Sequence, residues 1–289
     1  KVNYWTGDEC RQFEKEFAKF SNTEFAVALS NGTLALDVAL KAMNIGDGDD
    51  VIVTSRTFLA SASSIVTAGA NPVFADVDLN SQNITAQSIE TVLTEQTKAI
   101  IVVHLAGIPA EMDDIMALAK KHNLYVIEDC AQAHGAKYKG KPVGSIGHIG
   151  TWSFCQDKIM TTGGEGGMVT TNDKELWSKM WSYKDHGKSY DAIYNRQHPS
   201  GFRWLHESFG TNWRMLEMQA VIGRIQLTRM PEWTEKRQQN AKLLENSLST
   251  FSSIRTVEVA DYIEHAQYKY YAFVKPEHLK TGWDRDRII

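Results

Sequence analysis

The feature that most constrains the fold is a regular alternation of short, β-branched apolar runs with helical patterns. The apolar runs span residues 25–29, 51–54, 72–75, 99–103, 125–127, 150–154 and 167–171. Between most of them lie helical patterns at 33–43, 58–68, 86–93 and 112–122. Strands that alternate with helices build βαβ units. The sequence therefore predicts an α/β fold with a mostly parallel central sheet flanked by helices.

The pattern changes in the second half of the chain. Only a glycine-rich loop separates the runs at 150–154 and 167–171, so these strands are predicted to be antiparallel or far apart in the sheet. The later patterns are a helix at 174–184, a polar stretch at 185–210, helices at 215–228 and 232–247, and an aromatic strand at 268–274. Pro231 fits the first turn of the second of those two helices. We expect a large domain at 1–229 and a smaller α+β domain at 230–289.

Composition excludes several classes of partner. The chain has 289 residues and a formal net charge of −4, which offers no electrostatic footprint for nucleic acid. No apolar run approaches the ~18 residues that a membrane-spanning helix needs. Cys10, Cys130 and Cys155 are widely spaced without a CxxC pair, which argues against a disulfide framework or a zinc site. We expect a cytoplasmic protein that binds no metal, membrane or nucleic acid.

Two charged residues follow consecutive predicted strands. Asp129 ends one apolar run and Lys158 comes just after the next. Carboxyl ends of strands face the crevice where open α/β sheets bind ligands. A lysine amine can form a Schiff base with pyridoxal phosphate, and a carboxylate can keep the pyridine nitrogen protonated. Either residue alone is more often a solvated loop residue, so the pair needs support from a phosphate site.

Such a site is predicted at the start of the helix at 33–43. Gly32 would let backbone approach an anion, Thr33 adds a hydroxyl, and the helix N-terminus attracts negative charge. Ser153 could donate to the same phosphate. The alternative is a capped helix start without a ligand. No Walker loop or G-x-G-x-x-G fingerprint is present, which argues against an NAD-binding enzyme.

Several of these residues belong to longer motifs that run in one order along the chain. The motifs are SNGTLAL at 30–36, Thr57-Phe58, PVFADVD at 72–78, VVHLAG at 102–107, EDCAQAHG at 128–135, SFCQDK at 153–158, GEGG at 164–167, His186-Gly187 and GTNWRM at 210–215. With these motifs the chain resembles the DegT/DnrJ/EryC1/StrS family of sugar aminotransferases. The resemblance implies fold type I of the pyridoxal-phosphate enzymes, the fold of aspartate aminotransferase.

The resemblance also implies roles for the cofactor residues. Lys158 would carry the cofactor and move protons, and Asp129 would pair with the pyridine nitrogen. Phe58 would stack on the ring, although a lone phenylalanine is more often a core residue, and Gln132 would lie beside it. The residues implied to hold the phosphate are Gly32, Thr33 and Ser153.

Three further residues are implied to act across subunits or on substrate. Asn212 corresponds to the residue that the family sends across a homodimer interface to the neighbour's phosphate; the alternative is a cap for the helix at Met215. Arg214 is a candidate contact for a substrate anion. His186 is a candidate substrate residue, although a histidine in such a place is more often a loop or core residue.

The implied activity is transfer of an amino group from glutamate to a keto group of a nucleotide-linked deoxysugar, for surface polysaccharide or glycoside biosynthesis. The family's dehydratase branch has histidine where this chain has Lys158, which favours transamination. The alternatives are an aminocyclitol aminotransferase or other chemistry on this scaffold, and a non-catalytic regulatory protein that binds pyridoxal phosphate. Ser55-Arg56 and Ala106 depart from common family residues near the site. Relative to the family, we expect the small C-terminal domain to be incomplete.

Overall fold

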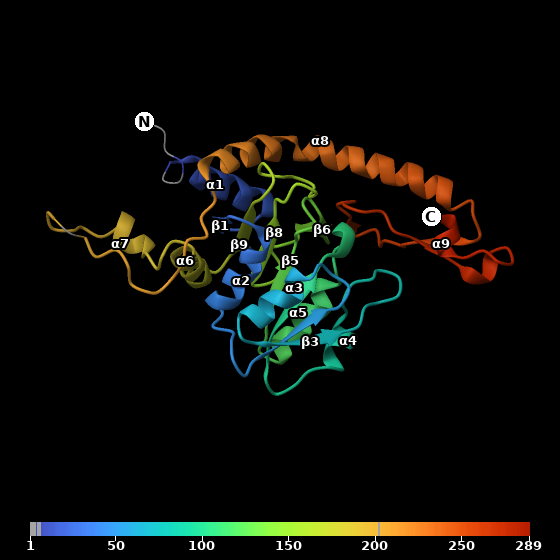
Figure 1. The fold of residues 1–289 in the computed structure, drawn as a ribbon, viewed down its shortest axis with the longest axis horizontal. Coiled ribbons are helices and arrows are strands. Elements are labelled where there is room, and N and C mark those ends of the chain that lie inside the picture. Colours follow the sequence, from blue (N-terminus) through green and yellow to red (C-terminus); the bar gives the residue numbers. More distant parts are fainter. Residues whose placement is uncertain (1–3, 5–6, 202) are drawn as a thin grey trace.

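A seven-stranded sheet lies at the centre of the molecule, with helices flanking it (Figure 1). The computed structural model describes residues 4, 7–201 and 203–289. The strand order is β1-β9-β8-β5-β4-β2-β3. The strands of this sheet are β1 (Phe25–Leu29), β2 (Asp50–Thr54), β3 (Asn71–Ala75), β4 (Thr97–Val103), β5 (Tyr125–Asp129), β8 (Ile149–Ser153) and β9 (Gly167–Thr171). Each of them matches a predicted run to within a few residues, which confirms the α/β prediction.

The direction of the strands follows the length of their connections. Strands β3, β2, β4, β5 and β8 pair in parallel, and helices lie in most of the connections between them. Strands β8 and β9 are antiparallel neighbours, with Ser153 opposite Gly167, and β1 is antiparallel to β9. The short glycine-rich connection between β8 and β9 leaves no room for a crossover helix. The antiparallel alternative predicted for this pair is therefore correct.

The helices cover both faces of the sheet. The longer ones are α1 (Glu9–Ser21), α2 (Gly32–Ala42), α3 (Ala60–Thr67), α5 (Met112–Lys121), α6 (Lys174–Tyr183) and α8 (Glu217–Leu248), and the shorter ones are α4 (Ala86–Glu90), α7 (Tyr190–Tyr194), α9 (Arg285–Ile288), η1 (Leu105–Gly107) and η2 (Pro276–His278). Successive strand residues point to opposite faces, so Val51 packs in one core cluster and Ile52 in another. A sheet buried on both faces explains why its strands read as continuous apolar runs.

Two helix predictions were wrong. The helices expected at 215–228 and 232–247 are one continuous helix, α8, which runs through Pro231 and along one side of the molecule (Figure 1). Met230 is buried and Trp233 packs on the same core cluster, so contacts on both sides of the proline keep the helix in place. The sequence also gave no prediction for α1, which packs against α8. The predicted boundary at 229/230 falls inside α8, so the domain division stays a prediction.

The C-terminal region is built from short elements. Strands β10 (Ile254–Thr256) and β12 (Ala272–Val274) pair with each other, and β11 (Ile263–Glu264) joins β6 (Lys137–Tyr138) and β7 (Lys141–Pro142). The strand expected at 268–274 is therefore shorter than predicted. The first residues of that run pair with the turn after β4 instead of a strand, since the amides of Tyr268 and Lys269 both donate to the carbonyl of Ala106. Among the described helices, none is both long and apolar enough to cross a bilayer.

Candidate active site

A cavity of about 710 Å³ lies at the carboxyl ends of the parallel strands β4, β5 and β8. Its wall includes the strand-end residues Val103, Asp129 and Ser153. It also includes most of the cofactor residues expected from the sequence, namely Gly32, Thr33, Phe58, Asp129, Gln132, Ser153 and Lys158. Segments separated by more than a hundred residues therefore meet at the sheet edge where open α/β sheets bind ligands.

Asp129 forms the buried acidic end of this cavity. It is 6% exposed, its Oδ2 accepts from the Ser61 hydroxyl at 2.8 Å, and its Oδ1 accepts from the Ala131 amide at 3.1 Å. Burial raises the pKa of Asp129, while the Ser61 and Ala131 hydrogen bonds and the nearby Lys158 oppose that rise. A buried carboxylate is costly unless a cation compensates it. The site thus suits a ligand that brings positive charge to Asp129.

Ser61 is a site residue that the sequence reasoning missed. It lies in α3, and its hydroxyl is 2.7 Å from the Thr57 hydroxyl as well as bonded to Asp129. The connection between β2 and α3 is short, and the first turn of α3 therefore lies next to the end of β5, where Ser61 reaches Asp129. Nothing in the local sequence connects a serine with an aspartate 68 positions away, so only the strand order reveals the contact.

Lys158 forms the basic end. Its side chain is 14% exposed, and its Nζ lies 3.5 Å from the Tyr268 hydroxyl and 3.8 Å from Asp157 Oδ2. Tyr268 in turn donates to Asp157 Oδ2 at 2.8 Å. Tyr268 belongs to the segment expected to be a strand, so the sequence did not identify it as a site residue.

A third part of the cavity wall, formed by the start of α2 and by Ser153, is suited to an anion. Gly32 begins α2, Asn31 caps the helix by accepting from the Leu34 amide at 3.0 Å, and the first turn carries no acidic residue. A Cβ on Gly32 would lie 2.5 Å from the Cβ of Ser153. Only glycine therefore lets the first turn of α2 approach Ser153 this closely. The helix N-terminus and the hydroxyls of Thr33 and Ser153 make a cradle with the chemistry of a phosphate site.

Phe58 and Gln132 both lie on the cavity wall, but the Phe58 ring is exposed whereas the Gln132 side chain is already hydrogen-bonded. Phe58 is 70% exposed and precedes α3, so it is not the core aromatic that the alternative interpretation required. An exposed ring at a cavity wall is available to cover a flat ligand. The Gln132 side chain is already engaged, since its Oε1 accepts from the Ala106 amide at 2.7 Å.

Asn212, His186 and Arg214 do not line this cavity. Asn212 is exposed and forms an isolated bridge with Asp185, and Arg214 forms an ion pair with Asp185. The helix after Asn212 begins at Glu217 with Leu216 at the cap position, so the alternative that Asn212 caps it is wrong. His186 is exposed, with a positive φ of 59°.

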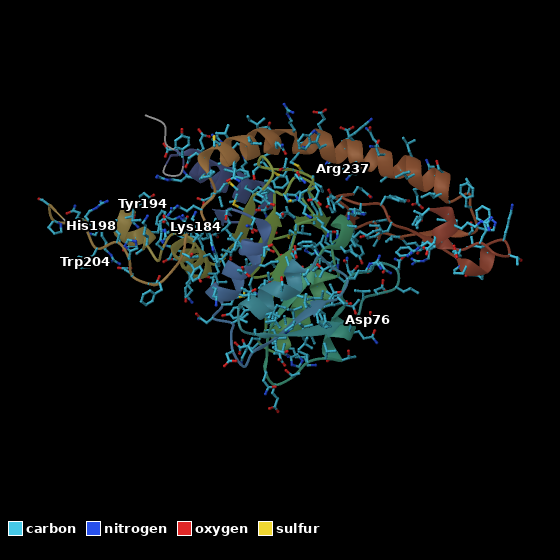
Figure 2. The ribbon with its side chains drawn as sticks, viewed as in Figure 1. Asp76, Lys184, Tyr194, His198, Trp204 and Arg237 are labelled. Carbon is cyan, nitrogen blue, oxygen red and sulfur yellow. The ribbon has the colours of Figure 1, made fainter. Side chains whose placement is uncertain are left out.

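Arg214 lines a second cavity, of about 660 Å³, between α1, α6 and α7. Lys184 and Tyr194, two residues of the wall of this second cavity, are labelled in Figure 2, to the left of Arg237 on α8. Two lysines of this cavity form ion pairs within the chain: Lys184 Nζ lies 2.9 Å from Glu14 Oε1, and Lys188 Nζ lies 3.1 Å from Asp185 Oδ1. Within one chain, the predicted substrate residue Arg214 and the predicted cofactor residue Lys158 line different cavities.

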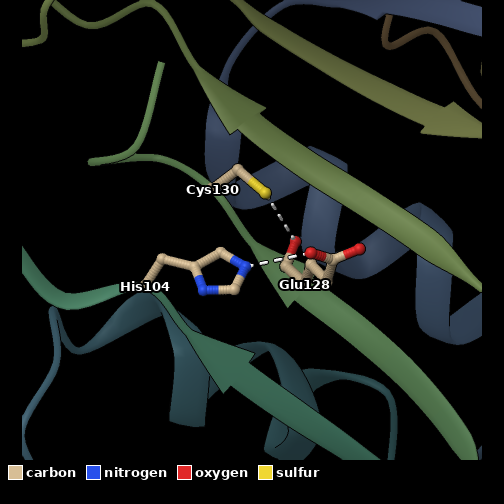
Figure 3. Close-up of side chains that lie close together, drawn as sticks. All are labelled: His104, Glu128 and Cys130. Atoms are coloured by element: carbon tan, nitrogen blue, oxygen red, sulfur yellow. Dashed lines mark hydrogen bonds and ion pairs between the residues drawn. The ribbon is translucent and has the colours of Figure 1, made fainter. Parts of the chain in front are cut away.

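His104, Glu128 and Cys130 lie close together around the end of β5 (Figure 3). Both ring nitrogens of His104 are engaged, Nε2 with Glu128 Oε2 at 3.0 Å and Nδ1 as acceptor from the Ala110 amide at 3.1 Å. Both Glu128 oxygens accept backbone amides of the loop at 144–147. Although burial opposes ionisation, these bonds hold the pKa of Glu128 below its usual value. With both oxygens committed to these bonds, the Glu128 carboxylate anchors the strand end beside Asp129 to the loop at 144–147.

Nearly the whole chain is similar to proteins of one known family. A family model described as the DegT/DnrJ/EryC1/StrS aminotransferase family matches residues 2–289. GDP-perosamine synthase of Escherichia coli O157:H7 is 40% identical over 86% of the chain and 65% of its own length. An aminotransferase structure from Psychrobacter cryohalolentis is 63% identical, with a TM-score of 0.97 over 99% of this chain and 75% of that one. DesV of S. venezuelae, solved with a ketimine intermediate, is 33% identical, with a TM-score of 0.87 over 96% and 71%.

These likenesses confirm the predicted fold and the predicted resemblance. The structural neighbours share the mostly parallel sheet flanked by helices. The chain spans just under two thirds of the length of the GDP-perosamine synthase that it matches.

Proposed function

Because the chain belongs to the DegT/DnrJ/EryC1/StrS aminotransferase family, we propose that it is a pyridoxal-phosphate-dependent aminotransferase. In this proposal glutamate is the amino donor, and the acceptor is the keto group of a nucleotide-linked deoxysugar. The family's enzymes use pyridoxal 5'-phosphate. The observation that carries the proposal is that Lys158, Asp129 and the Gly32–Ser153 cradle line one cavity.

The residues present fit this cofactor. When bound, pyridoxal phosphate supplies a ring that accepts an electron pair from the carbon losing its proton. Asp129 would hold the positive charge of the pyridine nitrogen, which would also compensate its own burial. Gly32, Thr33 and Ser153 would bind the phosphate, and the exposed Phe58 ring would cover one face of the pyridine and exclude water. Lys158 would hold the cofactor covalently and, once released, carry the proton between donor carbon and cofactor.

The proposed acceptor rests on the relatives. GDP-perosamine synthase is named for an amino sugar attached to a nucleotide, and a family relative from Bacillus subtilis is named for spore coat polysaccharide biosynthesis. An open cavity of about 710 Å³ leaves room for a sugar beside the cofactor. We therefore propose a role in polysaccharide or glycoside biosynthesis.

We further propose a homodimer with shared active sites. Asn212 is exposed and lies outside its own cavity, as expected for a residue that serves a neighbouring subunit. His186 and Arg214 would contact substrate in the same assembly. We also propose a small C-terminal domain that begins near residue 230. The free cysteines Cys10, Cys130 and Cys155 suit a reducing compartment, so we propose a cytoplasmic location.

The test follows the visible absorbance of the cofactor-loaded protein. Glutamate should bleach the band as the amino group moves to the cofactor, and 2-oxoglutarate should restore it. Nucleotide-linked keto sugars and cyclitol ketones are then offered as acceptors side by side, and only the sugars should restore the band. If glutamate leaves the band unchanged, the protein is a non-catalytic binder of pyridoxal phosphate. If cyclitol ketones restore it better, the acceptor class is wrong.

A further inference from the structure

The segment at residues 266–269, which contacts Lys158 through Tyr268, is held by the turn after β4. Within this segment the Tyr268 amide donates to the Ala106 carbonyl at 3.0 Å, and the Ala266 amide donates to the Gly107 carbonyl at 2.9 Å. Gly107 has a φ of 94°, and a Cβ there would lie 2.9 Å from both the Ala266 Cβ and the Gln132 carbonyl oxygen. Glycine at this turn is thus what allows the C-terminal segment to approach the sheet edge.

The close approach places the Tyr268 hydroxyl between two charged side chains. It donates to Asp157 Oδ2 at 2.8 Å and accepts from Lys158 Nζ at 3.5 Å. Burial and the hydrogen bond to Asp157 raise the pKa of Tyr268, so the hydroxyl keeps its proton and continues to donate. Although partial burial opposes it, the Tyr268 hydrogen bond and the nearby Lys158 hold the pKa of Asp157 below its usual value. The relay therefore has a fixed direction, from Lys158 through Tyr268 to the Asp157 carboxylate.

We propose that Tyr268 is a positioning residue for Lys158, whose amino group it holds toward the cavity, with Asp157 orienting the tyrosine hydroxyl. This inference rests on the proposed function, because a transaminase lysine must leave the cofactor, carry a proton and return. A free lysine side chain has several rotatable bonds and loses much freedom when fixed. A hydroxyl that restrains the released amine reduces that loss each time the lysine returns.

The test measures how fast cofactor-free protein recombines with pyridoxal phosphate, followed by the growth of visible absorbance. Tyr268→Phe keeps the ring and removes the hydroxyl, and we expect recombination to slow about tenfold, equivalent to about 1.4 kcal/mol. The matched control is Tyr270→Phe, which removes a hydroxyl from the same segment but one bonded to Glu245 of α8. The control should recombine at the wild-type rate, and both variants should keep the wild-type thermal midpoint.

A double-mutant cycle tests whether Asp157 acts through Tyr268. Asp157→Asn should slow recombination by less than Tyr268→Phe, since an amide oxygen can still accept the hydroxyl proton. The combined effect should be smaller than the sum of the two single effects, because Asp157 acts partly through Tyr268 and partly through its own contact with Lys158 at 3.8 Å. Additive effects, or a Tyr268→Phe protein that recombines at the wild-type rate, would overturn the proposal.

Gly107→Ala supplies a second route should Tyr268→Phe fold poorly. It displaces the segment and leaves Tyr268 intact, so slower recombination is expected, and an unchanged rate would count against the proposal. Recombination needs only cofactor binding, and it is therefore independent of the acceptor. If glutamate fails to bleach wild-type protein that has recombined, the proposed transamination fails, while the recombination rates still decide the role of Tyr268.

Discussion

The acidic end and the basic end of the cavity are built in different ways. At the acidic end, Asp129 is 6% exposed and is fixed by Ser61 and by the backbone of Ala131. At the basic end, Lys158 meets Asp157, whose side chain is 59% exposed, and Tyr268 from a distant segment. The acidic end is assembled by the sheet and its first helices, whereas the basic end needs the C-terminal segment to arrive. We infer that the sheet and its first helices by themselves fix the carboxylate proposed to face the ring nitrogen, whereas placement of the Lys158 amine depends on its contact with Tyr268.

The largest effect should come from Lys158→Ala at the basic end. Without the amine the cofactor has no covalent attachment, so its visible band should be lost and turnover should fall by about a thousandfold or more. Absorbance spectra and amino-transfer assays check both outcomes. A variant that retains the band would show that another lysine carries the cofactor, and the contrast between the two ends would lose its basis.

The next effect should come from Asp129→Asn at the acidic end. The amide can still bond to Ser61 but carries no charge, so the pyridine nitrogen loses its anionic partner. We expect turnover to fall by about a hundredfold or more while the visible band persists. Measuring the band and the turnover together separates this variant from Lys158→Ala. An Asp129→Asn protein with normal turnover would refute the charge role.

Ser61→Ala should have a smaller effect on the same end. The Ser61 hydroxyl stabilises the ionised form of Asp129, so its loss should raise the pKa of that carboxyl further and slow turnover by about tenfold. The acidic limb of the pH–rate profile should move to higher pH. As a control, Ser63→Ala in the same helix removes a hydroxyl that does not contact Asp129 in the described hydrogen bonds, and it should leave the limb in place.

The smallest effect concerns stability at His134, a buried histidine near Lys158. His134 is buried against the rings of Trp152 and Phe154, at 5.3 and 5.7 Å between centroids, and burial together with Lys158 lowers the pKa of His134 to about 3. The unfolded chain therefore binds the proton first, and the folded state loses stability as pH falls from about 6.5 toward about 3. His134→Leu should flatten this dependence by at most about 1.4 kcal/mol per pH unit. Urea unfolding at stepped pH measures the slope, and an unchanged slope would contradict the assignment.

The sequence predicted the strand ends and the start of α2 well, but it did not predict contacts between side chains that lie far apart along the chain. The strands ending in Asp129 and Ser153 were predictable because a doubly covered sheet leaves continuous apolar runs, and its strand ends define where ligands bind. The place of Gly32 and Thr33 at a helix start was predictable because its sequence signal is local to one turn, and their role in phosphate binding stays a prediction. Tyr268 and Ser61 were not, since each acts through a partner far away in sequence and their local patterns indicate only a strand and a helix.

The helix through Pro231 shows another limit of sequence reasoning. A proline normally marks a helix boundary, but Met230 and Trp233 both pack on the core and keep α8 continuous. Tertiary packing therefore outweighed the local signal. Asn212, His186 and Arg214 were predicted from the family motifs, and the roles proposed for them require a second subunit.

The most direct test of the account traps the bond between protein and cofactor. The wild-type protein is loaded with pyridoxal 5'-phosphate, reduced with borohydride, digested and analysed by mass spectrometry. We predict one reduced pyridoxyl group, on the peptide that contains Lys158, and none in the Lys158→Ala protein. A label on any other lysine, or no label on protein that shows the visible band, would contradict it.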